Sequence, residues 1–247
     1  MRTVLQFNTV AFDSVNLPRE IAAGTTFTFF VDNSNLDGED VLSESEEILV
    51  SWLFSFDLTR RLIFKELNIS ENVFYGLKII GPIIKDVRKK PGDIDVLICE
   101  NQKPHQAIAL ECKRVKVKAI DMENDKVNKI EKIRKGVEQA NALRELGFHK
   151  TFLTILVLAD GRERKEYNFL ARDPTTETYK QIYDFPRDKL HDDVGVIFVE
   201  IDQPIGKPIN DAAVVGICID KEAKQLEQPI HLTNRINELI RIKSLAK

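Results

Sequence analysis

Apolar residues recur at helical spacing in three stretches, which we expect to form amphipathic helices: residues 43–67, 127–146 and 232–247. The first stretch begins at Ser43 and has Glu46 three residues later, the pattern of an N-terminal capping box. Trp52 lies at helical spacing with neighbouring leucines and is therefore expected in the hydrophobic core. The second stretch is followed by Gly147, a residue type that commonly ends helices.

Shorter apolar or alternating runs predict strands at residues 4–12, 25–31, 72–83, 92–99, 107–115, 151–159, 194–201 and 212–220. The runs 151–159 and 194–201 are apolar at nearly every position, which is typical of central strands buried on both faces. The polar stretch 161–193 is expected to consist mostly of loops. Helices that alternate with strands in this order predict an α/β fold with a mixed central sheet.

The N-terminal part of the chain is expected to be an accessory element. A turn-like stretch, SNLDGED, ends at Asp40 and marks a plausible boundary. We therefore predict a β accessory segment over residues 1–40 and a main domain over residues 41–247. The accessory segment is a candidate for substrate selection or for homodimer formation.

Charge and cysteine content narrow the function classes. The net charge is −3, which argues against a protein that coats nucleic acid by bulk charge. Residues 85–150 nevertheless hold 16 Lys and Arg against 11 Asp and Glu, so the basic excess is local. Three scattered cysteines and four scattered histidines predict neither a disulfide framework nor a zinc site. With no signal-peptide pattern and no apolar run of about 18 residues, we expect a cytoplasmic protein.

Charged residues stand inside two otherwise apolar strands of the stretch 92–115. Strand alternation places Asp93 and Asp95 on one face of the first strand, and Glu111 and Lys113 on one face of the second. If the polar loop between them closes a hairpin, residues whose numbers sum to about 205 lie opposite one another. Asp95 and Glu111 then become cross-strand neighbours, with Lys113 one pleat away.

Two neighbouring carboxylates on an apolar sheet repel each other and need a cation or a shared proton. Oxygen ligands of this kind suit Mg²⁺ or Mn²⁺. A lysine beside them can orient an attacking water and balance negative charge, which outlines metal-assisted phosphodiester hydrolysis. The alternative is that these residues have only a structural role, as an ion-pair cluster at the end of a sheet, which is costly to bury.

The tripeptide Glu-x-Lys alone carries no weight, because it occurs three times in the chain. Glu163–Lys165 and Glu222–Lys224 lie in charged stretches, where solvated ion pairs explain them better. Glu111–Lys113 is the one set in an apolar strand with an acid 16 residues upstream on another strand.

With GDIDVL followed by IALECK, the chain resembles the PD-(D/E)xK nuclease superfamily, also called restriction-endonuclease-like, over about residues 43–160. The resemblance implies a restriction-endonuclease-like core with a mixed central sheet flanked by helices. It implies that Asp95 and Glu111 bind the metal, that Lys113 is catalytic, and that the Cys112 carbonyl is a further ligand. The thiol of Cys112 faces away from the carboxylates by alternation, so a nucleophilic cysteine is not expected.

The resemblance also implies residues from the flanking helices. Many members add a glutamate from the preceding helix, a role that Glu46 matches best and Glu47 matches second. Some members place a glutamine on the helix after Glu-x-Lys, which Gln139 matches, although Leu143 replaces the tyrosine of RecB-like members. The literal Pro-Asp pair is absent, so either Asp93 or Asp95 can be the principal ligand, and the hairpin register favours Asp95.

Basic residues surround this stretch and form either a solvated face or a rim that contacts phosphates: Lys85, Arg88, Lys89, Lys90, Arg114, Lys116 and Lys118. We therefore expect a nuclease that depends on Mg²⁺ or Mn²⁺ and acts on DNA. The alternative is a non-catalytic nucleic-acid-binding or assembly module that keeps the nuclease fold. A small-molecule phosphoesterase is a weaker third interpretation, because histidine clusters and a phosphate-binding glycine loop are lacking.

Overall fold

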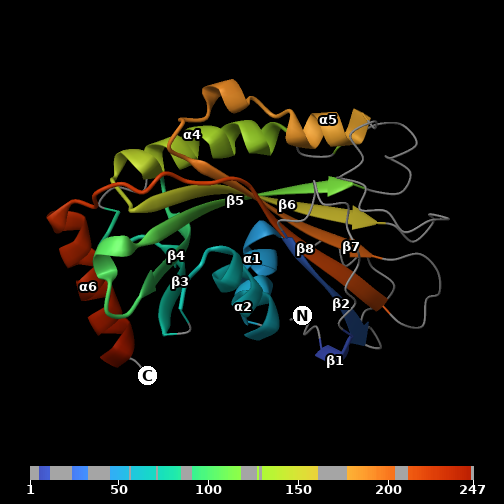
Figure 1. Cartoon of the computed structure of the whole chain (residues 1–247), viewed down its shortest axis with the longest axis horizontal. Coiled ribbons are helices and arrows are strands. Elements are labelled where there is room, and N and C mark those ends of the chain that lie inside the picture. Colours follow the sequence, from blue (N-terminus) through green and yellow to red (C-terminus); the bar gives the residue numbers. More distant parts are fainter. Residues whose placement is uncertain are drawn as a thin grey trace.

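Eight strands form one mixed sheet with helices on both of its faces (Figure 1). The computed structural model describes residues 6–11, 24–32, 45–55, 57–70, 72–84, 91–117, 127, 130–160, 177–203 and 211–245. The strands are β1 (Gln6–Ala11), β2 (Gly24–Asp32), β3 (Val73–Ile79), β4 (Ile94–Glu100), β5 (Ile108–Val117), β6 (Lys150–Asp160), β7 (Gly195–Gln203) and β8 (Asp211–Lys221). The helices are α1 (Glu46–Ser55), α2 (Asp57–Glu66), η3 (Pro104–Gln106), α4 (Glu131–Glu145), α5 (Glu177–Tyr183), η5 (Arg187–Lys189) and α6 (Ile230–Leu245).

The strand order is β1-β2-β8-β7-β6-β5-β4-β3. Strands β5, β6 and β7 are parallel, and the other neighbours pair antiparallel, so the sheet is mixed and the predicted α/β class is confirmed. Strand β6 is buried from Thr151 to Leu158, as its continuous apolar sequence predicts. Strands β1 and β2 extend the same sheet through β8. The proposed domain boundary at residue 40 stays a prediction.

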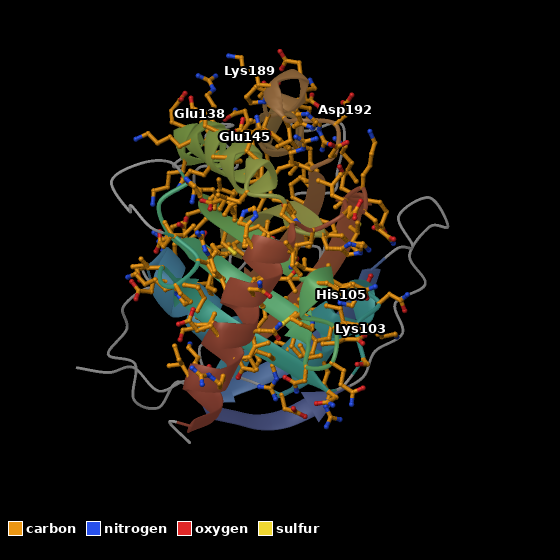
Figure 2. The ribbon with its side chains drawn as sticks, turned by 90° about the vertical axis from the view of Figure 1, so that its left-hand side faces the viewer. Lys103, His105, Glu138, Glu145, Lys189 and Asp192 are labelled. Carbon is orange, nitrogen blue, oxygen red and sulfur yellow. The ribbon has the colours of Figure 1, made fainter. Side chains whose placement is uncertain are left out.

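Two layers of helices cover the sheet (Figure 1). Helices α1 and α2 pack on one face, where their apolar residues join Val96, Ile98 and Leu110. Helices α4 and α5 pack on the other face against alternate residues of β5, β6 and β7. Helix α6 covers the β4 end of the sheet on the α4 side, and Figure 2 shows Glu138 and Glu145 on the outer side of α4. These two acids of α4 therefore lie on its solvent-facing side, as its amphipathic pattern requires.

The predicted helix 43–67 is instead two helices, α1 and α2. The guanidinium of Arg60 donates a hydrogen bond to the Phe54 carbonyl (2.9 Å), which satisfies an acceptor at the end of α1. Asp57 stands in the first turn of α2, where a negative charge suits the helix dipole. Ser43 of the predicted capping box lies outside the described residues, as does the side chain of Trp52.

The stretch 161–193, predicted as loop, contains α5 and η5. Ile182 and Tyr183 of α5 are buried against the sheet, so this short helix is stabilised by tertiary packing rather than by its own sequence. Helix α4 starts at Glu131 and ends as predicted before Gly147, which adopts a positive φ of 90°.

Strands β4 and β5 separate from each other soon after their hairpin turn. They pair at Ile98↔Ile108, Leu97↔Ala109 and Val96↔Leu110, whereas β5 pairs with β6 along its whole length. The turn, marked by Lys103 and His105 in Figure 2, lies at the other end of the strands from Asp95. These pairs agree with the predicted hairpin register, and the ladder ends one residue before Asp95 and Glu111 would pair. A fork between β4 and β5 therefore opens at Asp95.

Candidate functional site

Beyond Leu110, β4 no longer pairs with β5. Two carboxylates there accept hydrogen bonds from backbone N–H groups of β5 that a paired strand would otherwise accept. The backbone N–H of Cys112 donates to Asp95 Oδ2 at 2.6 Å. The backbone N–H of Arg114 donates to Glu46 Oε2 at 2.8 Å. Buried backbone donors must find acceptors, and here side chains from β4 and from the first turn of α1 supply them. Both carboxylates are thereby held at the fork.

The ammonium of Lys113 lies among the carboxylates. Its Nζ is 2.5 Å from Glu111 Oε1, 3.5 Å from Glu46 Oε1 and 3.9 Å from Asp95 Oδ2. It also donates to the Cys112 carbonyl at 2.8 Å. The structure therefore brings together the acids and the lysine that the sequence singled out on β4 and β5, and it adds Glu46 from α1.

Burial and crowding oppose the ionised form of the acids. Burial raises the pKa of Asp95 to about 6, against the lowering effect of Lys113 and of the Cys112 N–H. Burial and the charge of Asp95 raise the pKa of Glu111 to about 8. Burial alone would lower the pKa of Lys113, but the charges of Glu111, Asp95 and Glu46 outweigh it and raise that pKa. One ammonium thus faces three carboxylates, and the cluster favours additional positive charge.

The oxygen atoms at the fork are of the chemical kind that a hard divalent cation prefers. They are the carboxylate oxygens of Glu46, Asp95 and Glu111 and the carbonyl oxygen of Cys112, which suit Mg²⁺ or Mn²⁺. Glu111 Oε2 is buried and has no hydrogen-bond partner, a polar atom that a neighbouring cation would satisfy. Within the described ranges, no three His, Cys, Asp or Glu side chains are arranged to hold a metal ion by themselves.

A cavity of about 600 Å³ opens beside this cluster. It is lined by Ser45, Glu46, Glu47, Val50, Ser51, Leu77, Lys78, Asp93, Asp95, Lys113, Lys132 and Gln139. The side-chain amide of Gln139 donates to the Pro91 carbonyl at 3.2 Å. Gln139 therefore holds the turn that precedes β4, and through it the start of the strand that carries Asp95.

The sequence left open the choice between Glu46 and Glu47 and between Asp93 and Asp95. The geometry distinguishes the two members of each pair. Glu46 contacts Lys113, whereas Glu47 is exposed and pairs with Lys78 at 2.7 Å. Asp95 lies within 4 Å of the Lys113 ammonium, and Asp93 lines the cavity. Glu46 and Asp95 are the members of each pair that join the cluster. Their role as metal ligands stays a prediction.

Helix α4 approaches β5 closely at a glycine. A Cβ added to Gly136 would lie 2.5 Å from Cγ of Lys113 and 2.9 Å from Cδ1 of Leu153. The stem of Lys113 therefore occupies the space that a larger residue at position 136 would need. Gly136 thus lets the buried lysine pass under α4 and reach the carboxylates.

The prediction of an exposed basic rim is wrong for two of its seven residues. Arg114 is 4% exposed and Lys116 is 8% exposed, so neither lies on a solvated face. They alternate with Lys113 along β5 and share the face of Cys112, which α1 and α2 cover. The other proposed rim residues lie outside the described ranges: Lys85, Arg88, Lys89, Lys90 and Lys118.

Two lysines in the cavity were missed by the sequence analysis. Lys132 stands seven residues before Gln139, so the two share one face of α4, and this spacing was readable in the sequence. Lys78 lies on β3 between Leu77 and Ile79, whose partners on β4 are the two neighbours of Asp95. The negative charge of Glu47, through a hydrogen bond and through its field, raises the pKa of Lys78.

The thiols and the exposed Glu-x-Lys tripeptide behave as the sequence predicted. All three cysteines are free, and burial holds the pKa of the Cys112 thiol well above its usual value. Glu222 and Lys224 are exposed, and Lys224 pairs with Asp193 at 3.0 Å. Glu163–Lys165 lies outside the described residues. Glu222 and Lys224 are therefore separate from the cluster at the fork.

The helices in the described part of the chain all lack the length and apolar character needed to cross a membrane. Comparison with known proteins found no matching protein-family model, no similar curated protein and no similar solved structure.

Proposed function

We propose that this protein is a metal-dependent nuclease that hydrolyses phosphodiester bonds, most readily in DNA, on a restriction-endonuclease-like core. One observation carries the proposal: Nζ of Lys113 lies within 4 Å of three carboxylates at the fork between β4 and β5, beside an open cavity. The resemblance of GDIDVL and IALECK to the PD-(D/E)xK superfamily supports the same interpretation. The proposed partner is a nucleic acid, and homodimer formation and a cytoplasmic location stay predictions.

The charge balance of the cavity supports the proposal of a bound cation. Three lysines face five carboxylates at and behind the cavity wall: Glu46, Glu47, Asp93, Asp95 and Glu111. A polyanionic substrate is repelled by such a site unless positive charge is added. Bound Mg²⁺ or Mn²⁺ would supply that charge and activate water for attack on phosphorus.

The residues of the chain then have distinct roles. Asp95, Glu111 and the Cys112 carbonyl would hold the cation, with Glu46 as a further ligand from α1. Lys113 is placed to donate hydrogen bonds to the attacking water and to offset charge that develops on the phosphate. Gln139 positions the turn before β4 through the Pro91 carbonyl.

Metal removal tests the proposal. The full chain is incubated with plasmid, linear duplex, single-stranded and branched DNA and with RNA, in Mg²⁺ or Mn²⁺. We expect cleavage that stops in EDTA and returns when the metal is restored, because the carboxylates and Lys113 do not by themselves activate water. Gel electrophoresis of the products measures it.

Two outcomes would contradict the proposal. Cleavage that persists in EDTA would exclude the metal from the reaction. Salt-dependent binding of nucleic acid without cleavage, across all metals and substrates, would favour the non-catalytic binding module instead.

Substitution of Gly136 by alanine should lower activity through Lys113. The new methyl group displaces the lysine stem, and misplacement of a catalytic group by about 1 Å costs roughly 10²-fold in rate. The overpacking should also lower the free energy of unfolding by about 1–2 kcal/mol, despite the better helix propensity of alanine. Initial rates and urea unfolding measure the two effects.

Lys135→Ala is the matched control for this substitution. Lys135 is the exposed neighbour of Gly136 on α4, so its truncation should change neither the rate nor the stability appreciably. Equal rates for Gly136→Ala and Lys135→Ala would show that α4 does not control the position of Lys113.

A further inference from the structure

Lys78 has a backbone conformation that is unusual for a residue inside a β-strand. Its φ is 51°, in the left-handed region, although Leu77 and Ile79 beside it pair regularly with Val96 and Ile94. A non-glycine residue in this region is strained and persists where its surroundings hold it, most often at functional sites. The strain therefore points to a constraint on where the Lys78 side chain must lie.

That side chain lies in the wall of the cavity that also contains Asp95 and Lys113. Its ammonium is 2.7 Å from Glu47 Oε2, and the two side chains are 54% and 66% exposed. Exposed ion pairs of this kind contribute little stability and exchange partners easily. A phosphate, which forms charge-assisted hydrogen bonds with lysine, can therefore take the place of the Glu47 carboxylate.

The position of Lys78 relative to the cluster decides which phosphate it can reach. Leu77 pairs with Val96 and Ile79 with Ile94, so interpolation sets position 78 opposite Asp95, and neighbouring strands are about 4.8 Å apart. Lys113 reaches the same acid from β5, on the opposite side of the fork. Two lysines thus flank Asp95, one buried in the cluster and one exposed at the cavity wall.

We infer that Lys78 binds a backbone phosphate next to the one that is cleaved, and that Glu47 holds Lys78 until the substrate displaces it. This inference rests on the proposed nuclease function and narrows the substrate to a polynucleotide. A small phosphodiester such as bis(p-nitrophenyl) phosphate has no second phosphate and cannot use Lys78.

The experiment compares three test variants and one control variant of the full chain on an oligonucleotide and on bis(p-nitrophenyl) phosphate. Lys78→Gln should raise KM for the oligonucleotide about tenfold, the value of one charge-assisted contact, with kcat little changed. It should also make KM less dependent on salt concentration, by the amount expected for the loss of about one phosphate contact. Glu47→Gln should lower KM about threefold, because the competing carboxylate is gone. KM for the small diester should stay constant.

Lys78→Gly separates the strain from the charge. Glycine adopts a positive φ without steric strain, which offsets its larger loss of conformational entropy, so this variant should melt close to the temperature of the wild type. It should nevertheless show the same rise in KM as Lys78→Gln. Lys65→Gln, which removes one exposed charge from the last turn of α2, is the charge-matched control and should leave KM within twofold.

The outcomes separate this inference from the proposed function. If the chain binds the oligonucleotide without cleaving it, catalysis is rejected, and the same variants are compared by Kd from fluorescence anisotropy, with the same expected directions. The inference that Lys78 binds a backbone phosphate is overturned if Lys78→Gln and Glu47→Gln change affinity in the same direction. It is equally overturned if neither changes it, if the small diester responds as strongly as the oligonucleotide, or if no nucleic acid binds.

Discussion

Replacement of Lys113 by methionine is expected to reduce the rate of DNA cleavage by roughly 10²- to 10³-fold, the effect of losing one group that stabilises charge in a transition state. Methionine fills the space of the lysine stem under Gly136 but cannot donate a hydrogen bond or offset negative charge. In the metal-free protein, Glu111 and Asp95 lose their counter-ion, and removing one partner of a buried ion pair costs about 3–5 kcal/mol of stability. Initial rates and urea unfolding, each with and without Mg²⁺, measure the two effects.

The two readouts distinguish catalysis from simple ion pairing. If the carboxylates bind a divalent cation, Mg²⁺ should restore part of the lost stability without restoring the rate. Lys224→Met is the matched control, since Lys224 ends a Glu-x-Lys tripeptide in an exposed segment and should leave the rate unchanged. Cleavage by Lys113→Met within tenfold of the wild type would remove Lys113 from the mechanism.

The pairing of β4 with β5 was predictable because a short hairpin loop leaves little freedom of register. Strand alternation then determines which side chains share a face, so Asp95 and Glu111 could be brought together before the structure was known. The same reasoning separated Glu111–Lys113 from the exposed Glu222–Lys224. The central strands were predictable for a different reason: β6 is apolar on both faces and can be stable only between two layers.

The docking of the helices was not predictable in the same way. Glu46 and Glu47 are adjacent in the sequence, and only the angle at which α1 meets the sheet decides that Glu46 faces Lys113. Likewise, alternation assigns Arg114 to a face of β5 but does not tell whether helices cover that face. The basic rim was wrong in this part because α1 and α2 bury it.

The fork itself left no signal in the residue pattern. Both segments have strand-like sequences along their whole length, and their separation after Val96↔Leu110 becomes visible only in the pairing. Yet the separation frees the backbone groups of Cys112 that bond Asp95 and Lys113. The left-handed conformation of Lys78 was equally hidden, because lysine is not a residue type that signals a positive φ.

Asp95→Asn is expected to reduce the rate of metal-dependent cleavage by roughly 10²- to 10³-fold with little change in the fold. The asparagine oxygen can still accept the hydrogen bond from the Cys112 N–H, so the start of β4 stays attached to the edge of β5. What is lost is one negative charge next to the proposed cation. Affinity for Mn²⁺, measured by titration calorimetry, should fall at least about tenfold, since carboxylates are preferred ligands of such ions.

Asp93→Asn is the matched control, because it makes the same chemical change two residues earlier in the wall of the same cavity. The hydrogen bond to Cys112 and the contact with Lys113 belong to Asp95, so Asp93→Asn should alter the rate and the Mn²⁺ affinity by less than tenfold. The reverse ranking would make Asp93 the principal ligand and would require β4 to shift by one pleat when metal binds. Equal and small effects of both variants would remove the β4 acids from the site and leave Glu111 and Lys113 as a structural ion pair.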